Sequence, residues 1–251
     1  MQFKQSHRIY HSYASTHTGQ QYGDLLLYKN SLKVFDWRLK GLLPEDRDAR
    51  CLDIACGAGM FLNYLKERGY RNITGVDISS EQVALAKQVC DNVSECDFNN
   101  FLTDERKFEL ITIFSFIEHL TRDEAMELLD NVHRALAPGG RVILITPNAD
   151  SPFASHMRYG DVTHEVIYNQ SSLSSLLRAC GFTNCRAFET GPVPHGLKSG
   201  IRWALWKIIS GGLKAYRLIE GGSSNGWIFT TEFIMVADKF AGSPSNITER
   251  F

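Results

Sequence analysis

The residues best suited to chemistry surround a glycine turn in the first quarter of the chain. An apolar run that contains one carboxylate, Asp53, ends in Gly57-x-Gly59, and a helix-like apolar pattern begins at residue 60. Glycine allows backbone conformations that a Cβ forbids, and it lets a ligand approach the main chain. The free N–H groups at the start of the next helix carry partial positive charge. The sequence therefore predicts a strand, a tight turn and a helix that together cradle a nucleotide-type ligand.

The spacing of these residues narrows the kind of nucleotide. A dinucleotide fingerprint has a third glycine three residues after the second, whereas Leu62 stands at that position here. A second apolar run ends in Asp77, about 20 residues after the glycines, the separation at which a carboxylate meets ribose hydroxyls. Asp53 suits a cationic ligand better than a pyrophosphate. A ligand with ribose, no phosphate and a positive charge matches S-adenosyl-L-methionine.

Five segments in a fixed order resemble the class I S-adenosylmethionine-dependent methyltransferases, over roughly residues 50 to 148. They are Leu52–Gly59, Val76–Ser79, Glu95–Phe98, Phe108–Leu120 and Leu136–Asn148. The resemblance implies that Asp77 binds the ribose, that Asp97 accepts a hydrogen bond from the adenine amino group and that Phe98 lies against the adenine ring. The full set of residues it implies for the cofactor S-adenosyl-L-methionine is Asp53, Ala55, Gly57, Gly59, Asp77, Ile78, Asp97, Phe98, Phe114, Ser115 and His119.

Strand-like and helix-like runs alternate through the middle of the chain, which is typical of right-handed βαβ units and a buried parallel sheet. We expect strands near 50–55, 72–77, 93–97, 108–114, 140–146, 182–189 and 228–237, and helices near 59–68, 80–92, 122–136 and 171–179. The fold class is therefore α/β: a Rossmann-like doubly wound sheet of about seven mostly parallel strands, with an antiparallel last strand.

The flanking segments suggest a simple domain organisation. We expect an N-terminal helical cap over residues 1–40, a methyltransferase domain over 41–241 with a helical insert at 191–227, and a mobile tail at 242–251. In the resembled family such an N-terminal segment often covers the cofactor site; packing against the domain is the equal alternative. Pro138-Gly139-Gly140 predicts a turn before the fifth strand.

Two histidines are candidates for the acceptor side of a methyl transfer. A hydroxyl acceptor must lose its proton, and a nearby base makes that easier. His119 follows the fourth strand, and His164 lies in the loop that should face the acceptor, next to Asp161, which could orient it. Backbone bonding at a helix start is the alternative for His119, and His195 is a weaker third candidate. We assign no metal site, because His7, His11 and His17 are too loosely spaced.

The loop around His164 also bears on the acceptor. The run Asp161-Val-Thr-His164 and the later Ser172–Phe182 resemble a subset found among bacterial polysaccharide and sugar methyltransferases. O-methylation of a sugar or polysaccharide precursor is therefore the leading hypothesis. A ubiquinone-type or other small-molecule O-methyltransferase remains an alternative, because 108–120 resembles that group. A non-catalytic cofactor-binding protein remains another, and a nicotinamide-dependent oxidoreductase is disfavoured by the missing glycine.

The insert contains an apolar, tryptophan-bearing segment, which Gly211-Gly212 is expected to break in two. Over residues 198–220 its five basic residues face a single acid, Glu220. A basic amphipathic segment can lie on an anionic membrane surface. A lid over the acceptor site and a dimer contact stay open as alternatives, and the oligomeric state is undetermined.

Composition restricts the remaining possibilities. The chain has 251 residues, 43% hydrophobic and 22% charged, with a net charge of −1, so no general basic field favours nucleic acid. No apolar run is long enough to span a membrane, and no secretory pattern stands at the N-terminus. The six cysteines form no Cys-x-x-Cys pair and are expected to be reduced. We expect a cytoplasmic protein, with peripheral contact at the inner face of the membrane as an option.

Overall fold

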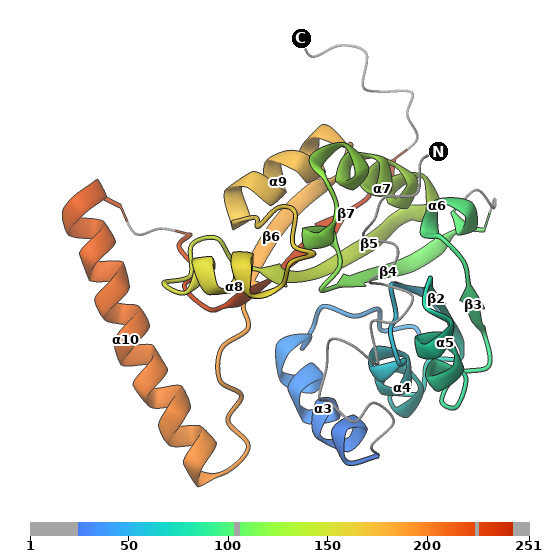
Figure 1. Ribbon diagram of the computed structural model, residues 1–251, viewed down its shortest axis with the longest axis horizontal. Helices are drawn as coiled ribbons and strands as arrows, with labels where there is room; N and C mark the ends of the chain where they lie inside the picture. Colours follow the sequence, from blue (N-terminus) through green and yellow to red (C-terminus); the bar gives the residue numbers. More distant parts are fainter. Residues whose placement is uncertain (1–24, 103–105, 224–225, 243–251) are drawn as a thin grey trace.

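The computed structural model describes residues 25–102, 106–223 and 226–242. Its centre is a seven-stranded sheet in the order β3-β2-β1-β4-β5-β7-β6 (Figure 1). The parallel part comprises β1 (Arg50–Ile54), β2 (Asn72–Asp77), β3 (Val93–Glu95), β4 (Phe108–Phe114) and β5 (Leu136–Pro147). The last strand, β7 (Glu232–Asp238), pairs antiparallel with both β5 and β6 (Thr183–Glu189). The predicted Rossmann-like α/β class, with an antiparallel last strand, is confirmed.

Helices cover both faces of the sheet, so its inner strands are apolar on both sides. One face carries α6 (Phe98–Phe101), α7 (Arg122–Ala135) and α9 (Gln170–Ala179); the other carries α3 (Leu25–Arg38), α4 (Met60–Glu67) and α5 (Ser80–Ala86). Side chains of one strand alternate between the two cores. In β5, Val142 and Leu144 join the α7 side, whereas Ile143 and Ile145 join the α4 side.

Two helices next to the rim begin with reciprocal caps, because a helix start leaves backbone N–H groups without partners. Thr121 and Glu124 form such a capping box at α7, and Asn169 and Ser172 form one at α9. A cap of this kind stabilises a helix by about 1 kcal/mol. The caps hold the amino ends of both helices at the edge where the parallel strands end.

Several element boundaries differ from the sequence-based expectation. Helix α5 ends at Ala86, and the chain up to Cys90 continues in tighter turns, such as Val89 N–H to the Ala86 carbonyl (3.0 Å). Strand β5 begins at Leu136, because the Pro138-Gly139-Gly140 turn is accommodated as a bulge in its pairing with β4. Strand β7 begins at residue 232 rather than 228, and the expected loops contain two short helices, α6 and α8 (Ala154–Gly160).

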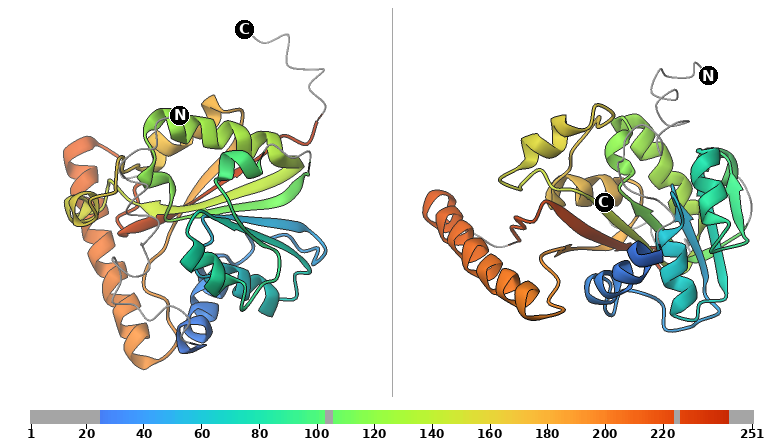
Figure 2. Two further views of the ribbon diagram at one scale, coloured as in Figure 1. Left: turned by 45° about the vertical axis from the view of Figure 1, so that its right-hand side comes forward. Right: turned by 60° about the horizontal axis from the view of Figure 1, so that its bottom comes forward.

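Helix α10 (Leu197–Gly221) projects from the edge of the molecule beside β6 (Figures 1 and 2), and its Trp206 and Lys207 are bonded to Glu189 of that strand. The expected break at Gly211-Gly212 is wrong, since the helix runs without interruption for 25 residues. A glycine costs a helix about 1 kcal/mol relative to alanine but keeps its backbone hydrogen bonds, so two glycines weaken this long helix without ending it. None of the helices that the structure describes is long and apolar enough to cross a membrane.

The proposed N-terminal cap is seen only through α3. Its Arg38 donates to the carbonyl of Thr190 (3.2 Å) and lies 3.6 Å from the Glu232 carboxylate, so α3 is tied to the far end of the sheet. Two further predictions lie outside the described residues: the tail from residue 243, and the three histidines His7, His11 and His17. The domain boundaries at 40 and 242 stay predictions.

Candidate functional site

The glycine turn connects β1 to α4 at the carboxyl end of the sheet. Gly57 (φ 53°) and Gly59 (φ 81°) both have left-handed backbones, as the sequence reasoning required. A Cβ on Gly59 would lie 3.0 Å from Ala86 of α5, so this glycine permits close packing. Among the described residues, a Cβ on Gly57 would meet only the Gln82 side-chain oxygen, at 3.9 Å. As far as these residues are concerned, the space beside Gly57 can take a ligand.

Two residues other than glycine also have positive φ at this edge. Ala55 (φ 55°) follows β1, and Ser115 (φ 49°) follows β4. For such residues this conformation costs about 1–3 kcal/mol, and it occurs preferentially at functional sites. Both were predicted cofactor residues. They lie after neighbouring strands on either side of the point where the strand order reverses, which is where open α/β sheets bind ligands.

Asp77 ends β2 and faces the glycine turn. Its carboxylate accepts hydrogen bonds from the backbone N–H groups of Gly57 (2.9 Å) and Ser79 (2.9 Å). Burial raises the pKa of Asp77, while these backbone donors act in the opposite direction. A carboxylate has about four lone-pair sites, so two backbone bonds leave acceptor capacity for a ligand hydroxyl. Asp77 thus both shapes the turn and fits the predicted ribose role.

Gln82 is a candidate that sequence reasoning missed. It lies in the first turn of α5, and its side-chain oxygen is buried without a hydrogen-bond partner among the described residues. An unpaired buried polar atom is costly, and in a native structure it requires an explanation. Its place beside Gly57 supplies one, since a bound ligand could donate to it. The position of Gln82 shortly after Asp77 was the available signal.

Asp53 lies on β1 beneath the same edge and is only 3% exposed. The Thr112 hydroxyl on β4 donates to its carboxylate at 2.6 Å. The pKa of Asp53 is raised to about 7, chiefly by burial and also by the nearby Asp77 charge, against the lowering effect of the bond from Thr112. A cation near Asp53 would favour its charged form, as the sequence reasoning expected of a positively charged ligand.

The remaining predicted cofactor residues occupy the ends of β2, β3 and β4. Ile78, Asp97 and Phe98 are half-buried. The Asp97 carboxylate accepts from the Asn99 N–H (2.8 Å) as the N-cap of α6, and the Phe98 ring packs edge-on against Phe116 at 5.6 Å. Their assigned contacts to adenine stay predictions. The structure gives Asp97 a capping role that the spacing did not reveal.

Helix α3 covers the glycine turn from the outside. The Tyr28 hydroxyl donates to the Ala58 carbonyl at 2.6 Å, and the buried ring is held against the turn. Phe35 packs against Phe61 of α4 (5.2 Å between ring centroids) and against Phe114 at the end of β4 (6.1 Å). The Phe114 ring thus contributes to an aromatic cluster between α3, α4 and β4.

On the acceptor side, three polar side chains form a connected chain. Thr163 donates its hydroxyl to the Asp161 carboxylate (2.6 Å) and lies 2.9 Å from Nδ1 of His119. Because a carboxylate only accepts, the hydroxyl proton points to Asp161, and Nδ1–H of His119 donates to Thr163. In the neutral ring, Nε2 of His119 is then the unprotonated nitrogen. Asp161 therefore orients His119 through Thr163.

His164 is bonded to the backbone of α8. Its Nδ1 lies 2.5 Å from the Met157 carbonyl, which can only accept, so Nδ1 carries the proton. Asp161 was expected to orient His164; its carboxylate accepts from the Thr163 backbone N–H and hydroxyl, and its role toward His164 stays a prediction. The rings of His119 and His164 are nevertheless neighbours, with centroids 4.8 Å apart.

Glu118 adds a buried acid to this group. It is 1% exposed and accepts from the Thr146 hydroxyl at the end of β5 (3.0 Å). The pKa of Glu118 is raised to about 8, chiefly by burial and also by the nearby acids Glu232 and Asp161, against the lowering effect of its hydrogen bonds. The side-chain donor atoms of Glu118, His119 and His164 all lie within 4.8 Å of one another. From the sequence alone, Glu118 was assigned no role.

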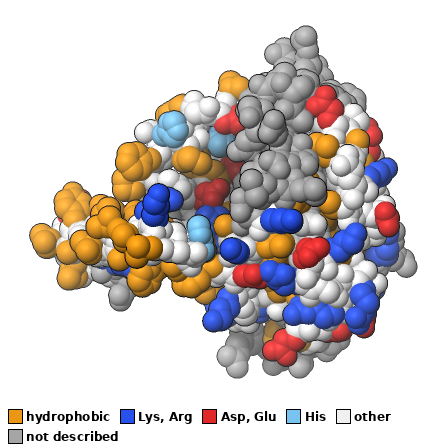
Figure 3. Space-filling model, turned by 90° about the horizontal axis from the view of Figure 1, so that it is seen from below, with side chains coloured by type: hydrophobic (Ala, Val, Ile, Leu, Met, Phe, Trp, Pro, Cys, Tyr) orange, Lys and Arg blue, Asp and Glu red, His pale blue; other side chains and the backbone are white. Residues whose placement is uncertain are grey.

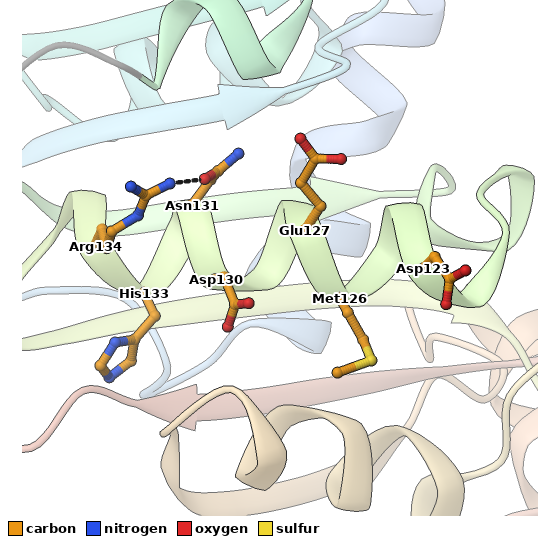
Figure 4. A pocket seen from close by; sticks show the side chains of 7 residues that line it. All are labelled: Asp123, Met126, Glu127, Asp130, Asn131, His133 and Arg134. Atoms are coloured by element: carbon orange, nitrogen blue, oxygen red, sulfur yellow. Dashed lines mark hydrogen bonds between the residues drawn. The ribbon is translucent and has the colours of Figure 1, made fainter.

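A separate hollow of about 680 Å³ runs along α7 (Figure 4). All of its lining residues come from that one helix, and their side chains fan out on both sides of it. None of the predicted site residues takes part. The hollow therefore lacks the convergent polar groups of a binding site.

Comparison with known proteins places this geometry in a family. A family model described as "Methyltransferase domain" matches residues 27–187, which include the glycine turn, Asp77 and the Asp161–His164 loop. The chain belongs to the methyltransferase-domain family. As a fold it is similar to a crystal structure of an S-adenosylmethionine-dependent methyltransferase from Archaeoglobus fulgidus, with a TM-score of 0.61, 22% identity and coverage of 85% of this chain and 94% of that one.

This methyltransferase domain also has curated relatives. One is a malonyl-[acyl-carrier protein] O-methyltransferase of Enterobacter lignolyticus, 30% identical over 115 residues, or 45% of each chain. Another is a ubiquinone biosynthesis O-methyltransferase of Coxiella burnetii, 29% identical over 124 residues, or 47% of this chain and 50% of that protein. The chain spans about half the length of the curated relatives it matches.

The family implies S-adenosyl-L-methionine as the cofactor, and the residues of this methyltransferase domain fit it. The open space at Gly57, the unpaired oxygen of Gln82 and the remaining acceptor capacity of Asp77 match a ligand with ribose hydroxyls. The buried carboxylate of Asp53 suits a nearby positive charge. The individual contacts stay predictions.

Proposed function

We propose that the protein transfers a methyl group from S-adenosyl-L-methionine to a hydroxyl of a sugar or polysaccharide precursor. When bound, the cofactor supplies an electrophilic methyl on a positively charged sulfur. The observation that carries the proposal is the placement of two parts after neighbouring strands, β1 and β4. One is the glycine turn with Asp77, and the other is the His119, Thr163 and Asp161 chain at the end of β4.

The second part gives the domain a means to move a proton. His119 presents Nε2 as its basic nitrogen, because Nδ1–H donates to Thr163. The Asp161 carboxylate at the end of the chain stabilises the ring after it takes a proton from a hydroxyl. Partial burial raises the pKa of Asp161, but the Thr163 bonds and the two histidines outweigh that effect, so its pKa is lowered and it stays charged.

The acceptor class has weaker support than the reaction. The Asp161-x-Thr-His164 pattern that resembles sugar methyltransferases lies against Glu118, because the N–H of Glu165 donates to the Glu118 carbonyl at 2.8 Å. A ubiquinone-type acceptor is the second candidate, since a relative of that name matches about half the chain. A cofactor-binding protein without turnover is the third.

Two experiments separate these functions. Calorimetry with S-adenosylhomocysteine tests the cofactor: we expect binding by the folded protein, and its absence would reject the proposal. Labelled cofactor is then incubated with sugar, nucleotide-sugar and lipid-quinone precursors. Labelling of the sugars supports the leading acceptor, and exclusive labelling of quinones moves the proposal to the second candidate. Binding with no turnover on any acceptor favours the third.

A single variant tests the acceptor-side histidine. His164→Ala is expected to leave the affinity for S-adenosylhomocysteine unchanged and to lower turnover at least tenfold, because the side chain lies on the acceptor side and not at the glycine turn. Equal rates for both proteins would remove His164 from the acceptor site. His156→Ala, which alters an exposed histidine on α8, is the matched control.

We further propose that α10 binds an anionic membrane surface. Its apolar side chains are widely exposed, including Ile208 (72%) and Ile219 (85%), and they gather over the protruding helix in Figure 3. A second copy is a poorer occupant, because a two-fold contact would bring together two helices that each carry five basic residues and one acid. Buried apolar area and attraction to anionic lipids act together in such helices.

Flotation with vesicles tests this surface. We expect the protein to bind phosphatidylglycerol-containing vesicles, to bind zwitterionic vesicles more weakly, and to lose binding in an Ile208→Ser, Ile219→Ser double variant. Phe240→Ser removes another exposed apolar side chain, outside α10, and is the control. Two outcomes would contradict the proposal. One is vesicle binding that depends neither on lipid charge nor on the two isoleucines; the other is a wild-type dimer that becomes a monomer in the double variant.

A further inference from the structure

Three potential metal ligands converge from two segments of the chain. Glu118 and His119 belong to η1 (Ile117–His119) after β4, and His164 belongs to the loop after α8. The backbones of the segments are joined, since the N–H groups of Glu165 and Val166 both donate to the Glu118 carbonyl (2.8 and 3.1 Å). One donor atom from each of the three side chains lies within 4.8 Å of the others.

The hydrogen bonds around both imidazoles match those of metal-binding histidines. Such histidines donate their second ring N–H to a carbonyl or carboxylate, which sets the tautomer and the ring orientation. Here Nδ1–H of His164 donates to the Met157 carbonyl, and Nδ1–H of His119 donates to Thr163, which donates to Asp161. In each neutral ring the nitrogen without a proton is therefore Nε2.

The surrounding charge favours a cation. The buried Glu118 carboxylate is held by the Thr146 hydroxyl, and the charged groups that act on it, Glu232 and Asp161, are also acids. Burying a carboxylate without a positive partner is costly. Glu232 has Arg38 at 3.6 Å, but an ion between Glu118 and the two imidazoles would offset the charge that remains at the centre.

We propose that Glu118, His119 and His164 bind one divalent transition-metal ion, such as Zn²⁺, Co²⁺ or Mn²⁺. Two imidazoles and a carboxylate suit these ions and leave coordination positions open. Donors bound at about 2.1 Å are at most about 4.2 Å apart, so the ion would draw the three side chains slightly together. With the ion bound, Nε2 of His119 would be a ligand and not the proton acceptor, and the ion would instead lower the pKa of an acceptor hydroxyl at one of the open positions. This last step rests on the proposed function.

The same acids could instead serve the positive sulfur of the cofactor, so the test uses the metal alone. Protein freed of metal by a chelator and free of cofactor is titrated with CoCl₂, and the visible absorption of bound Co²⁺ is recorded. We expect one Co²⁺ per chain in this signal. Glu118→Gln and His164→Ala are each expected to weaken binding at least tenfold, and His156→Ala is expected to leave it unchanged.

Two outcomes would overturn the proposal. One is the absence of a Co²⁺ signal up to millimolar metal; the other is unchanged Co²⁺ affinity in both Glu118→Gln and His164→Ala. Binding of S-adenosylhomocysteine by each variant shows that the variant is folded. A protein that binds S-adenosylhomocysteine but not Co²⁺ loses the metal site and keeps the proposed function, whereas the reverse result rejects the function and keeps the site.

Thr163 is the positioning residue of this centre. Thr163→Val keeps the shape but removes the hydroxyl that joins His119 to Asp161, and partners of this kind typically change metal affinity 10–100-fold. We expect Thr163→Val to weaken Co²⁺ binding within that range and Thr163→Ser to restore it. Equal affinities for the two variants would show that the hydroxyl does not act on the metal.

Discussion

At the scale of single residues, the site depends on carboxylates with different surroundings. Asp77 is bound by backbone N–H groups at the edge of the sheet, whereas Asp53 is buried beneath that edge with one hydroxyl partner. The first environment fixes an acceptor that suits the predicted ribose contact. The second holds a carboxyl whose charge responds to a cation nearby. The same residue type therefore has two different environments on neighbouring strands, β1 and β2.

Asp77→Ala is expected to weaken the binding of S-adenosylhomocysteine by about 1–3 kcal/mol, the range for one or two lost hydrogen bonds. The substitution also frees the N–H groups of Gly57 and Ser79, which loosens the turn. Calorimetry measures the affinity, with the exposed Asp91→Ala as control. Unchanged affinity in Asp77→Ala would show that this carboxylate does not contact the ribose.

The raised pKa of Asp53 should make the free energy of unfolding depend on pH. Burial raises its folded pKa to about 7, whereas an unfolded aspartate has a pKa of about 3.9. Between these values the folded state keeps a proton that the unfolded state has lost, so Asp53 reduces stability as the pH rises through this window. The difference in unfolding free energy between wild type and Asp53→Asn should fall with pH, by up to about 1.4 kcal/mol per unit. Urea unfolding without cofactor measures it, and a difference that stays constant from pH 5 to pH 8 would contradict the assignment.

At the level of helices and strands, a glycine in β2 is required by close packing, whereas a glycine in α10 is not. Gly75 is in the middle of β2, where a Cβ would lie 2.6 Å from the buried Leu62 side chain. Gly211 is in α10, where a Cβ would meet nothing within 4 Å. Close approach of α4 to the sheet requires the first glycine, and nothing in the packing requires the second.

Alanine substitution should therefore have opposite effects at these positions. Gly75→Ala overpacks the core and is expected to destabilise the fold by about 1–3 kcal/mol in chemical unfolding. Gly211→Ala is expected to stabilise α10 by up to about 1 kcal/mol, seen as slower amide hydrogen exchange within residues 197–221. Effects of the same sign at both glycines would show that one of these environments is misassigned.

At the scale of the whole molecule, one compact sheet domain carries one projecting helix. Only Ser199 and Ser210 of α10 are buried, while the strands at the centre of the sheet are almost entirely so. Folding of the domain therefore gains little from α10. The helix is better explained by contact with another surface than by the stability of the chain.

Replacing α10 by a flexible Gly/Ser linker of the same 25 residues should separate the two functions. We expect a change in Tm of no more than about 4 °C, which corresponds to about 1 kcal/mol for a chain of this size. Affinity for S-adenosylhomocysteine should be unchanged, and binding to anionic vesicles should be lost. Loss of cofactor binding in a folded variant would instead favour α10 as a lid over the site.

Local patterns in the sequence were enough to predict the sheet and the glycine-turn side of the candidate site. Apolar periodicity and glycine spacing are local properties, and a βαβ unit places Gly57 and Asp77 at one edge whatever the rest of the chain does. Gln82 could have been proposed from its position five residues after Asp77. The structure identifies it as a candidate because its side-chain oxygen has no partner among the described residues and lies beside Gly57.

The contacts around His119 and the placement of α10 could be seen only in the folded structure. His119 and Thr163 are 44 positions apart, and their contact depends on how the loop after α8 packs against the end of β4. No local pattern encodes that packing, so the chain from Asp161 through Thr163 to His119 was not predicted. In the same way, an apolar helical pattern predicts that one face of a helix will be buried. It does not predict which surface will bury that face, because burial is a property of the assembled molecule.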